Sequence, residues 1–219
     1  MSGHDDFAFD PLPGLPERPP QGELILWQGR PDPWALARDA YRIRWIAAYF
    51  AIVVLWRAAA GLADGGPGLA LAMGLPYVGL GVLGLAVVYG LAWAQARTTT
   101  YTLTTARVVL RIGAALPVTY NLPFVQIGAA DLDLRRDGTG TIALATLGET
   151  RISGLVLWPH LRPGHWSKTQ PALRSIPDAA RIARLFADAA EARLSAPRIS
   201  RIASASEPSP GALVPVAAE

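Results

Sequence analysis

Between Leu69 and Ala96 the chain reads LALAMGLPYVGLGVLGLAVVYGLAWAQA, without a single charged side chain. A hydrocarbon core about 30 Å thick needs about 20 residues of helix, at a rise of about 1.5 Å each. The run is therefore too long for a helix in a soluble core and too short to cross a membrane twice. We predict a transmembrane helix over residues 69–94, kinked at Pro76, which membrane helices tolerate.

A second apolar run precedes the first one in the chain. It consists of WIAAYFAIVVLW (Trp45–Trp56), followed by Arg57 and AAAGLA. Residues 45–63 are just long enough to cross if Arg57 extends toward the far interface; the alternative is a buried helix of a soluble protein. The turn residues Gly65–Gly68 would separate the two runs, so the pair predicts a membrane α-helical hairpin.

Arginines flank this predicted hairpin on one side. Arg38, Arg42 and Arg44 precede it and further arginines follow it, whereas the connecting loop carries only Asp64. Positive charge favours the cytoplasmic side, so we expect both termini in the cytoplasm of a bacterial inner membrane. The expected interfacial anchors are Trp45, Trp93 and Arg97 on the cytoplasmic side and Trp56 on the opposite side.

Two local patterns in and beside the hairpin have competing interpretations. Ala86, Gly90 and Ala94 recur every four residues, so this face could pack against the first helix or a partner. Equally, Gly and Ala are simply common here. Residues Pro33–Arg44 predict either a short interfacial helix or a plain extension of the first membrane helix.

The soluble part divides into three segments by composition. Residues 1–33 are rich in proline and acids and predict an extended segment, in which only Gly22–Asp32 is expected to pack. Residues 98–194 form the predicted cytoplasmic domain, and residues 195–219, rich in Ser, Pro and Ala, a disordered tail.

Residues 98–157 carry the Thr, Val and Tyr content and close turn signals of antiparallel strands. Ser175–Asp178 follows as a capping-box pattern, and an apolar stripe over 182–190 predicts a helix that docks on the sheet. The fold class is thus a membrane hairpin plus a soluble β-barrel or sandwich of the pleckstrin-homology-like kind, with one C-terminal capping helix. The predicted strands are two within Thr98–Gly113, joined at Thr104–Ala106, then Ala115–Asn121, Gln126–Leu134, Thr141–Leu144 and Arg151–Leu157.

The sequence offers little for catalysis or cofactor binding. It has no cysteine, which excludes disulfides and thiol chemistry. Asp131 and Asp133 share a strand face but lie beside arginines, typical of a solvated strand end. We expect no catalytic site, no cofactor and no metal, and we see no cleavable signal peptide.

A loop rich in Trp, Arg and His is the candidate partner-binding surface. His160 and His165 flank a turn that contains Arg162, with Trp158 and Trp166 just outside. Trp and Arg dominate many protein interfaces, although plain packing is the main alternative and a metal site a minor one. The basic excess over 97–219 favours anionic membrane lipid rather than nucleic acid.

Several stretches resemble known bacterial proteins. Tyr101–Val109, Leu122–Ile127 and Gly138–Ile142 resemble the pleckstrin-homology-like domains found behind membrane-helix pairs, and Glu23–Pro31 is similar to the segment that precedes such helices. FDPLPGLPE near the start, ARTTTYTLTTARVVLRIG (Ala96–Gly113) and LVLWPHLRPGHW (Leu155–Trp166) resemble the PuhB-type photosynthetic complex assembly proteins of purple bacteria. The resemblance extends to about Leu194.

That family implies an accessory protein for building the photosynthetic reaction centre and its core light-harvesting complex. We therefore expect a non-enzymatic assembly factor in the intracytoplasmic photosynthetic membrane. Its implied partners are reaction-centre and core-antenna subunits and a second copy of itself, as a homodimer. The first alternative is a generic lipid-sensing or envelope membrane protein, and the second is a membrane enzyme with a site near Asp131 or His160.

Overall fold

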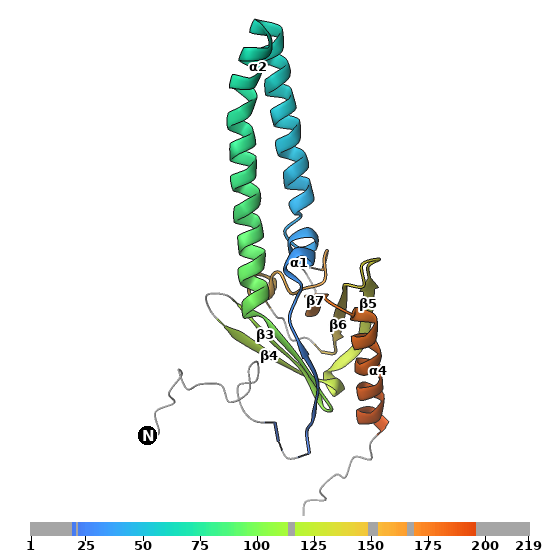
Figure 1. Cartoon of the computed structure of the whole chain (residues 1–219). Coiled ribbons are helices and arrows are strands. Elements are labelled where there is room, and N and C mark those ends of the chain that lie inside the picture. The colour runs from blue at the N-terminus through green and yellow to red at the C-terminus, as the bar shows by residue number, and fades with distance from the viewer. Residues whose placement is uncertain (1–18, 21, 114–116, 149–152, 166–168, 196–219) are drawn as a thin grey trace, which may run out of the picture.

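A long helical hairpin stands on a β-rich domain in the computed structural model of the chain (Figure 1). The structure describes residues 19–20, 22–113, 117–148, 153–165 and 169–195. The hairpin and the domain meet at one end of the helical pair, where a short helix, α1, lies between them.

The hairpin is formed by α2 (Ile43–Thr98), which reverses direction at two glycines. Gly65 and Gly66 are the residues of α2 with non-helical backbone angles, and Gly66 has a φ of 79°, which glycine adopts without strain. Helix resumes at Pro67, a residue suited to a first helical turn. The predicted turn at Gly65–Gly68 is thus confirmed but shorter, while the backbone angles stay helical at Pro76, where we predicted a kink.

Small residues let the two arms of α2 approach closely. A Cβ added at Gly81 would lie 3.0 Å from the Cβ of Phe50, and one added at Gly74 would lie 3.4 Å from the Cβ of Ala58. Gly74 and Gly81 are seven residues apart, so they share one helix face. Ala86 and Gly90 of the predicted small-residue face are exposed and Ala94 is partly buried, so packing of this face against a partner stays a prediction.

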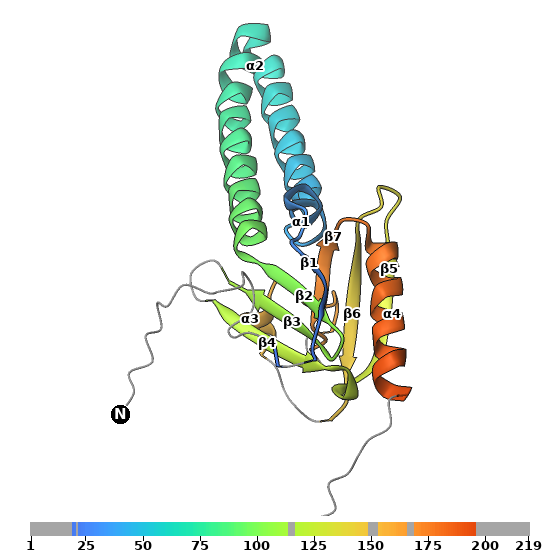
Figure 2. The ribbon, with the colours of Figure 1, turned by 60° about the horizontal axis from the view of Figure 1, so that its bottom comes forward.

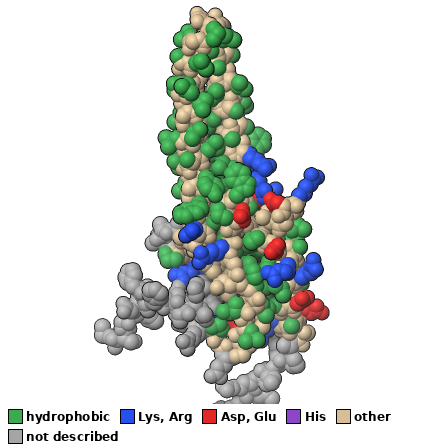
Figure 3. Space-filling view, in the orientation of Figure 1, with side chains coloured by type: hydrophobic (Ala, Val, Ile, Leu, Met, Phe, Trp, Pro, Cys, Tyr) green, Lys and Arg blue, Asp and Glu red, His purple; other side chains and the backbone are tan. Residues whose placement is uncertain are grey.

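The length and apolar character of α2 fit a membrane environment. Among the described residues it is the one helix long and apolar enough to cross a membrane, and 11% of its most apolar window is buried in the protein. A core helix of a soluble protein would be mostly covered. On the face shown in Figure 3, the outer part of the hairpin carries no charged side chain.

Helix α1 (Pro33–Asp39) is separate from the hairpin. It begins at Asp32, whose carboxylate accepts a hydrogen bond from the Ala35 N–H at 2.7 Å, and it is divided from α2 by Arg42 in the left-handed conformation. It buries Ala35 and Leu36 and contacts both α2 and β7. A separate helix is therefore confirmed over a plain extension, although it ends before Arg44.

Two antiparallel sheets form the domain (Figure 2). The four-stranded sheet has the order β1 (Ile25–Gly29), β2 (Thr100–Thr104), β3 (Arg107–Ile112) and β4 (Val118–Pro123). The 3₁₀ helix η1 (Phe124–Gln126) leads into the second sheet, whose order is β5 (Ile127–Leu134), β6 (Gly140–Thr146) and β7 (Ala172–Ile176). The five strands predicted between Thr98 and Leu144 are thus confirmed, with small shifts at their ends.

One hydrophobic core joins both sheets to the C-terminal helix α4 (Ala179–Ser195). Leu103 and Leu110 reach it from the first sheet, Leu144 from the second, and Ile182 and Phe186 from α4. Phe124 and Phe186 pack edge to face with ring centroids 5.4 Å apart. The docking of the predicted C-terminal helix is confirmed; residues 196–219 of the expected tail lie outside the described residues.

The segment between β6 and α4 differs from the prediction. The expected strand Arg151–Leu157 is wrong, because Gly154–Leu157 forms the short helix α3; residues 151–152 lie outside the described part. Ser175 is not a helix cap but part of β7, which was missed, and α4 begins only at Ala179. Pairing of Ile176 with Gly140 on β6 replaces the local capping pattern.

The close approach of the arms predicts a matched pair of outcomes. Gly81→Leu should lower the free energy of unfolding by about 1–3 kcal/mol, because the new side chain meets Phe50. Gly79→Leu, where an added Cβ meets nothing within 4 Å, is the control and should have little effect. Unfolding in mixed detergent micelles measures both; equal effects would contradict this packing.

Candidate functional site

A buried polar network joins the hairpin to the domain. His160 is fully buried, with its Nδ1 2.6 Å from the Tyr101 hydroxyl and its Nε2 3.1 Å from the Thr99 hydroxyl. Thr99 is the capping residue directly after α2, and Tyr101 lies in β2, the strand that follows it. The Tyr101 hydroxyl also accepts the backbone N–H of Arg174 on β7, at 3.1 Å. One histidine thus connects the end of the hairpin with both sheets.

The network holds His160 as a neutral imidazole. Each ring nitrogen has one hydroxyl partner, and a hydroxyl can donate or accept, so a neutral imidazole satisfies both contacts. Burial, and secondarily the nearby Arg174 charge, lowers the pKa of His160 to about 3. With both ring nitrogens engaged, this histidine has a structural role.

Arg174 ties α1 to the same network. Its guanidinium donates to the carbonyl of Pro159 at 3.0 Å and to the carbonyl of Asp39, the last residue of α1, at 2.7 Å. The side chain is almost fully buried, and burial lowers the pKa of the Arg174 guanidinium. The two carbonyl oxygens take the place of water around this buried cation.

Ion pairs hold α1 against the β5–β6 turn. The Asp39 carboxylate accepts from Arg38 Nε at 2.9 Å and from Arg135 Nε at 2.8 Å. Arg38 also pairs with Asp137 in the turn, and hydrogen bonds from Thr139 and Arg38 hold the pKa of the Asp137 carboxyl well below its ordinary value. The base of the hairpin is therefore fixed to the second sheet by several charged contacts.

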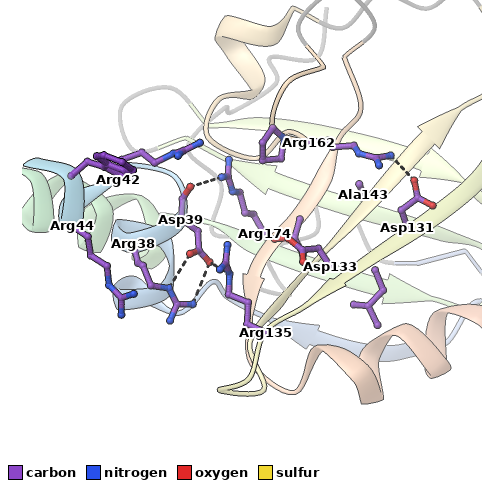
Figure 4. A pocket seen from close by; sticks show the side chains of 14 residues that line it. Arg38, Asp39, Arg42, Arg44, Asp131, Asp133, Arg135, Ala143, Arg162 and Arg174 are labelled. Carbon is purple, nitrogen blue, oxygen red and sulfur yellow. Dashed lines mark hydrogen bonds and ion pairs between the residues drawn. The ribbon is translucent and has the colours of Figure 1, made fainter.

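A cationic groove opens beside these contacts (Figure 4). It has a volume of about 580 Å³ and is lined by six arginines and three aspartates, together with Trp45. Asp39 and Asp131 are engaged by arginines of the groove, whereas Arg42 and Arg44 have no ion pair with any described residue. Positive charge thus remains unneutralised where the apolar hairpin begins. The arginines are Arg38, Arg42, Arg44, Arg135, Arg162 and Arg174, and the third aspartate is Asp133.

An apolar groove lies against the same part of α2. Trp34, Ala47, Ala86 and Tyr89 line a cavity of about 340 Å³ whose accessible lining is apolar. Arg44 lines both this cavity and the cationic groove. The two hollows therefore share one arginine at the base of the hairpin.

The residues of the predicted partner-binding loop lie in different environments. Trp158 is partly exposed and packs edge to face on Tyr41, with ring centroids 5.0 Å apart. Arg162 reaches the cationic groove and pairs with Asp131. His165 is half-buried, with Nδ1 3.2 Å from the Pro163 carbonyl oxygen.

The expectation that His160 belongs to a surface loop is wrong, because its ring nitrogens bond partners brought in by α2 and β2. Trp166 lies outside the described residues. The network residues Tyr101 and Arg174 were missed, since their partners are distant in sequence.

The predicted interfacial anchors lie on the hairpin surface. Trp45, Trp56 and Trp93 are all exposed, and the Arg97 guanidinium lies 4.8 Å from the ring centroid of Trp93. Arg57 instead stays beside the second arm, 5.7 Å from the ring centroid of Tyr77, a cation–π arrangement. Its Nε is buried and has no hydrogen-bond partner in the described structure.

The carboxylates of the groove lie among arginines. Asp131 is exposed and paired with Arg162, rather than held in a buried polar pocket. Within the described residues, no group of three or more His, Cys, Asp or Glu side chains could hold a metal ion. Arginines outnumber carboxylates in the groove, so its net charge is positive.

Comparison with known proteins identifies the domain. The sequence profile described as the bacterial PH domain matches residues 42–190, which include the whole hairpin and every strand of the two sheets except β1. The chain belongs to the bacterial PH domain family. The PH-like domain expected from the sequence, with its sheets and C-terminal helix, is thereby confirmed.

A curated relative of this bacterial PH domain protein comes from Rhodobacter capsulatus. It is 48% identical over 204 residues, which cover 91% of this chain and 94% of the relative, and it is described as an uncharacterized 23.7 kDa protein in the puhA 5′ region. A solved PH-domain protein of the DUF1696 family from Shewanella loihica is 12% identical. That match covers 42% of this chain and 71% of the other with a TM-score of 0.29, too low to argue from.

The buried network predicts that one hydroxyl stabilises the junction. Tyr101→Phe should lower the free energy of unfolding by about 2–4 kcal/mol, because the Arg174 N–H and His160 Nδ1 lose their partner. Tyr120→Phe on β4 is the control, since that hydroxyl makes no hydrogen bond with described residues; its effect should stay within about 0.5 kcal/mol. Denaturant unfolding of the full chain in detergent measures both, and equal effects would contradict the assigned network.

Proposed function

We propose that this bacterial PH domain protein is a membrane-bound, non-catalytic accessory factor for assembly of the photosynthetic reaction centre and its core light-harvesting complex. The observation that carries the proposal is the relative that is 48% identical over nearly the whole of both chains. Its description places it in the puhA 5′ region of Rhodobacter capsulatus. The sequence resemblance to PuhB-type assembly proteins supports the same role.

The membrane placement is part of the proposal. Each arm of α2 would cross the bilayer, with the tip at Gly65–Gly66 on the far side and both termini in the cytoplasm. At about 1.5 Å per residue, an arm from Ile43 to Asp64 would span about 30 Å, the thickness of the hydrocarbon core. The exposure of Trp45 and Trp93 at the base and the arginines beside them support this orientation.

A scaffolding action needs no reacting group. The hairpin would keep the PH-like domain at the membrane surface beside newly inserted subunits, and this raises the local concentration of partners. The proposed partners are reaction-centre and core-antenna subunits, membrane lipid and a second copy of this chain. Both ring nitrogens of His160 are hydrogen-bonded, and Asp131 is exposed and paired with Arg162. These contacts support a non-catalytic role.

Deletion of the gene tests this role. Reaction-centre and core-antenna absorbance in isolated membranes should fall severalfold under photosynthetic growth, while transcripts of the subunit genes stay at their normal level. Supplying the gene from a plasmid should restore the complexes, which excludes an effect on transcription of neighbouring genes. Normal complex levels in the deletion strain would refute the proposal.

A further inference from the structure

We propose that the cationic groove binds the headgroup of an anionic phospholipid, and that an acyl chain of the same lipid occupies the apolar groove beside it. This inference rests on the proposed insertion of the hairpin into a membrane. It goes further because it names one site, one class of ligand and the residues that recognise it.

The charge of the groove is the first observation. Arginines outnumber aspartates in its lining, and two aspartates are already held by ion pairs. Arg42 and Arg44 are exposed and have no anionic partner among the described residues. A guanidinium group binds phosphate through two parallel N–H donors, so a phosphodiester is a suitable counter-ion for this pair.

The second observation is the position of the groove at the level of the membrane surface. Arg42 and Arg44 stand at the first turn of α2, and the exposed Trp45 follows them directly. With α2 in a bilayer, this turn lies at the level where Trp side chains and lipid headgroups meet. Anionic lipids attract basic residues at this surface by about 1 kcal/mol for each Lys or Arg.

The apolar groove is the third observation, and it favours a lipid over a free anion. Its accessible lining is apolar, and Arg44 lines both hollows. A ligand that fills both must therefore join a negative group to a hydrocarbon chain, as a phospholipid does. Inorganic phosphate would use only the cationic groove and leave the apolar surface of Trp34 and Tyr89 exposed.

The groove is built before any ligand arrives. Asp39 is fixed by Arg38 and Arg135, and its carbonyl accepts from the buried Arg174. These contacts hold α1 and the second sheet at a set separation, with Arg42 just beyond α1. Because these walls are ordered by the protein itself, binding a headgroup needs to order only exposed side chains such as Arg42 and Arg44.

Lipid titration of the purified full chain tests the site. Native mass spectrometry from detergent micelles would measure the dissociation constant of the first bound phosphatidylglycerol, with phosphatidylcholine as the neutral comparison. Arg42→Gln with Arg44→Gln should weaken the phosphatidylglycerol site by roughly 10- to 30-fold and leave phosphatidylcholine unchanged. Arg181→Gln with Arg184→Gln removes the same charge from exposed positions on α4 and should have no effect.

Two further measurements separate the explanations. Ala86→Trp fills the apolar groove without changing charge and should also weaken phosphatidylglycerol binding; this variant keeps the test valid if the double arginine variant does not fold. An excess of inorganic phosphate should not displace the lipid. Equal loss in both double variants, no loss in Ala86→Trp, or displacement by phosphate would each overturn the inference.

Flotation with vesicles of pure phosphatidylcholine distinguishes this inference from the function on which it rests. Insertion into these vesicles without any preference for phosphatidylglycerol in the titration would refute the lipid site alone. Failure to insert at all would refute the proposed membrane anchoring, and the lipid site with it.

Discussion

The burial of His160 is the constraint on which the rest of the structure depends. A single residue, Thr99, separates α2 from β2, so the hairpin continues directly into the first sheet. His160 binds the hydroxyls of Thr99 and Tyr101, and Tyr101 accepts from Arg174 on the second sheet. Because these groups are buried, each would lose a hydrogen bond without replacement by water if the junction opened. The direction of the hairpin relative to the domain is therefore set by polar contacts.

The position of the groove follows from that junction. Arg174 reaches from the buried network to the last residue of α1, and Asp39 carries the connection on to Arg38 and Arg135. The same chain of contacts places Arg42 and Arg44 at the edge of the apolar hairpin. A cationic surface in this place suits a protein that works on components arriving in a membrane, since subunits and lipids both approach through that plane. This placement supports the proposed assembly role.

Local patterns predicted much of the fold, whereas distant contacts did not follow from the sequence. The turn at Thr104–Ala106 and the reversal at Gly65–Gly66 rest on residues adjacent in the chain, and both were predicted. Ser175 has the local pattern of a helix cap, yet it lies in β7 because Ile176 pairs with Gly140. His160 was expected at the surface beside a Pro–Gly turn, but its partners come from residues about sixty positions earlier. The cationic groove was not predicted for the same reason, since α1 and the β5–β6 turn come together only in the folded chain.

The most direct test of the account is the side of the membrane that each end of the hairpin faces. The chain has no cysteine, so single cysteines can be introduced at Asp64, beside the tip, and at Arg136, in the exposed β5–β6 turn. A membrane-impermeant maleimide applied to spheroplasts should label Asp64→Cys, whereas Arg136→Cys should react only in inverted membrane vesicles. Labelling of both positions from the same side would contradict a hairpin that crosses the membrane with its PH-like domain in the cytoplasm.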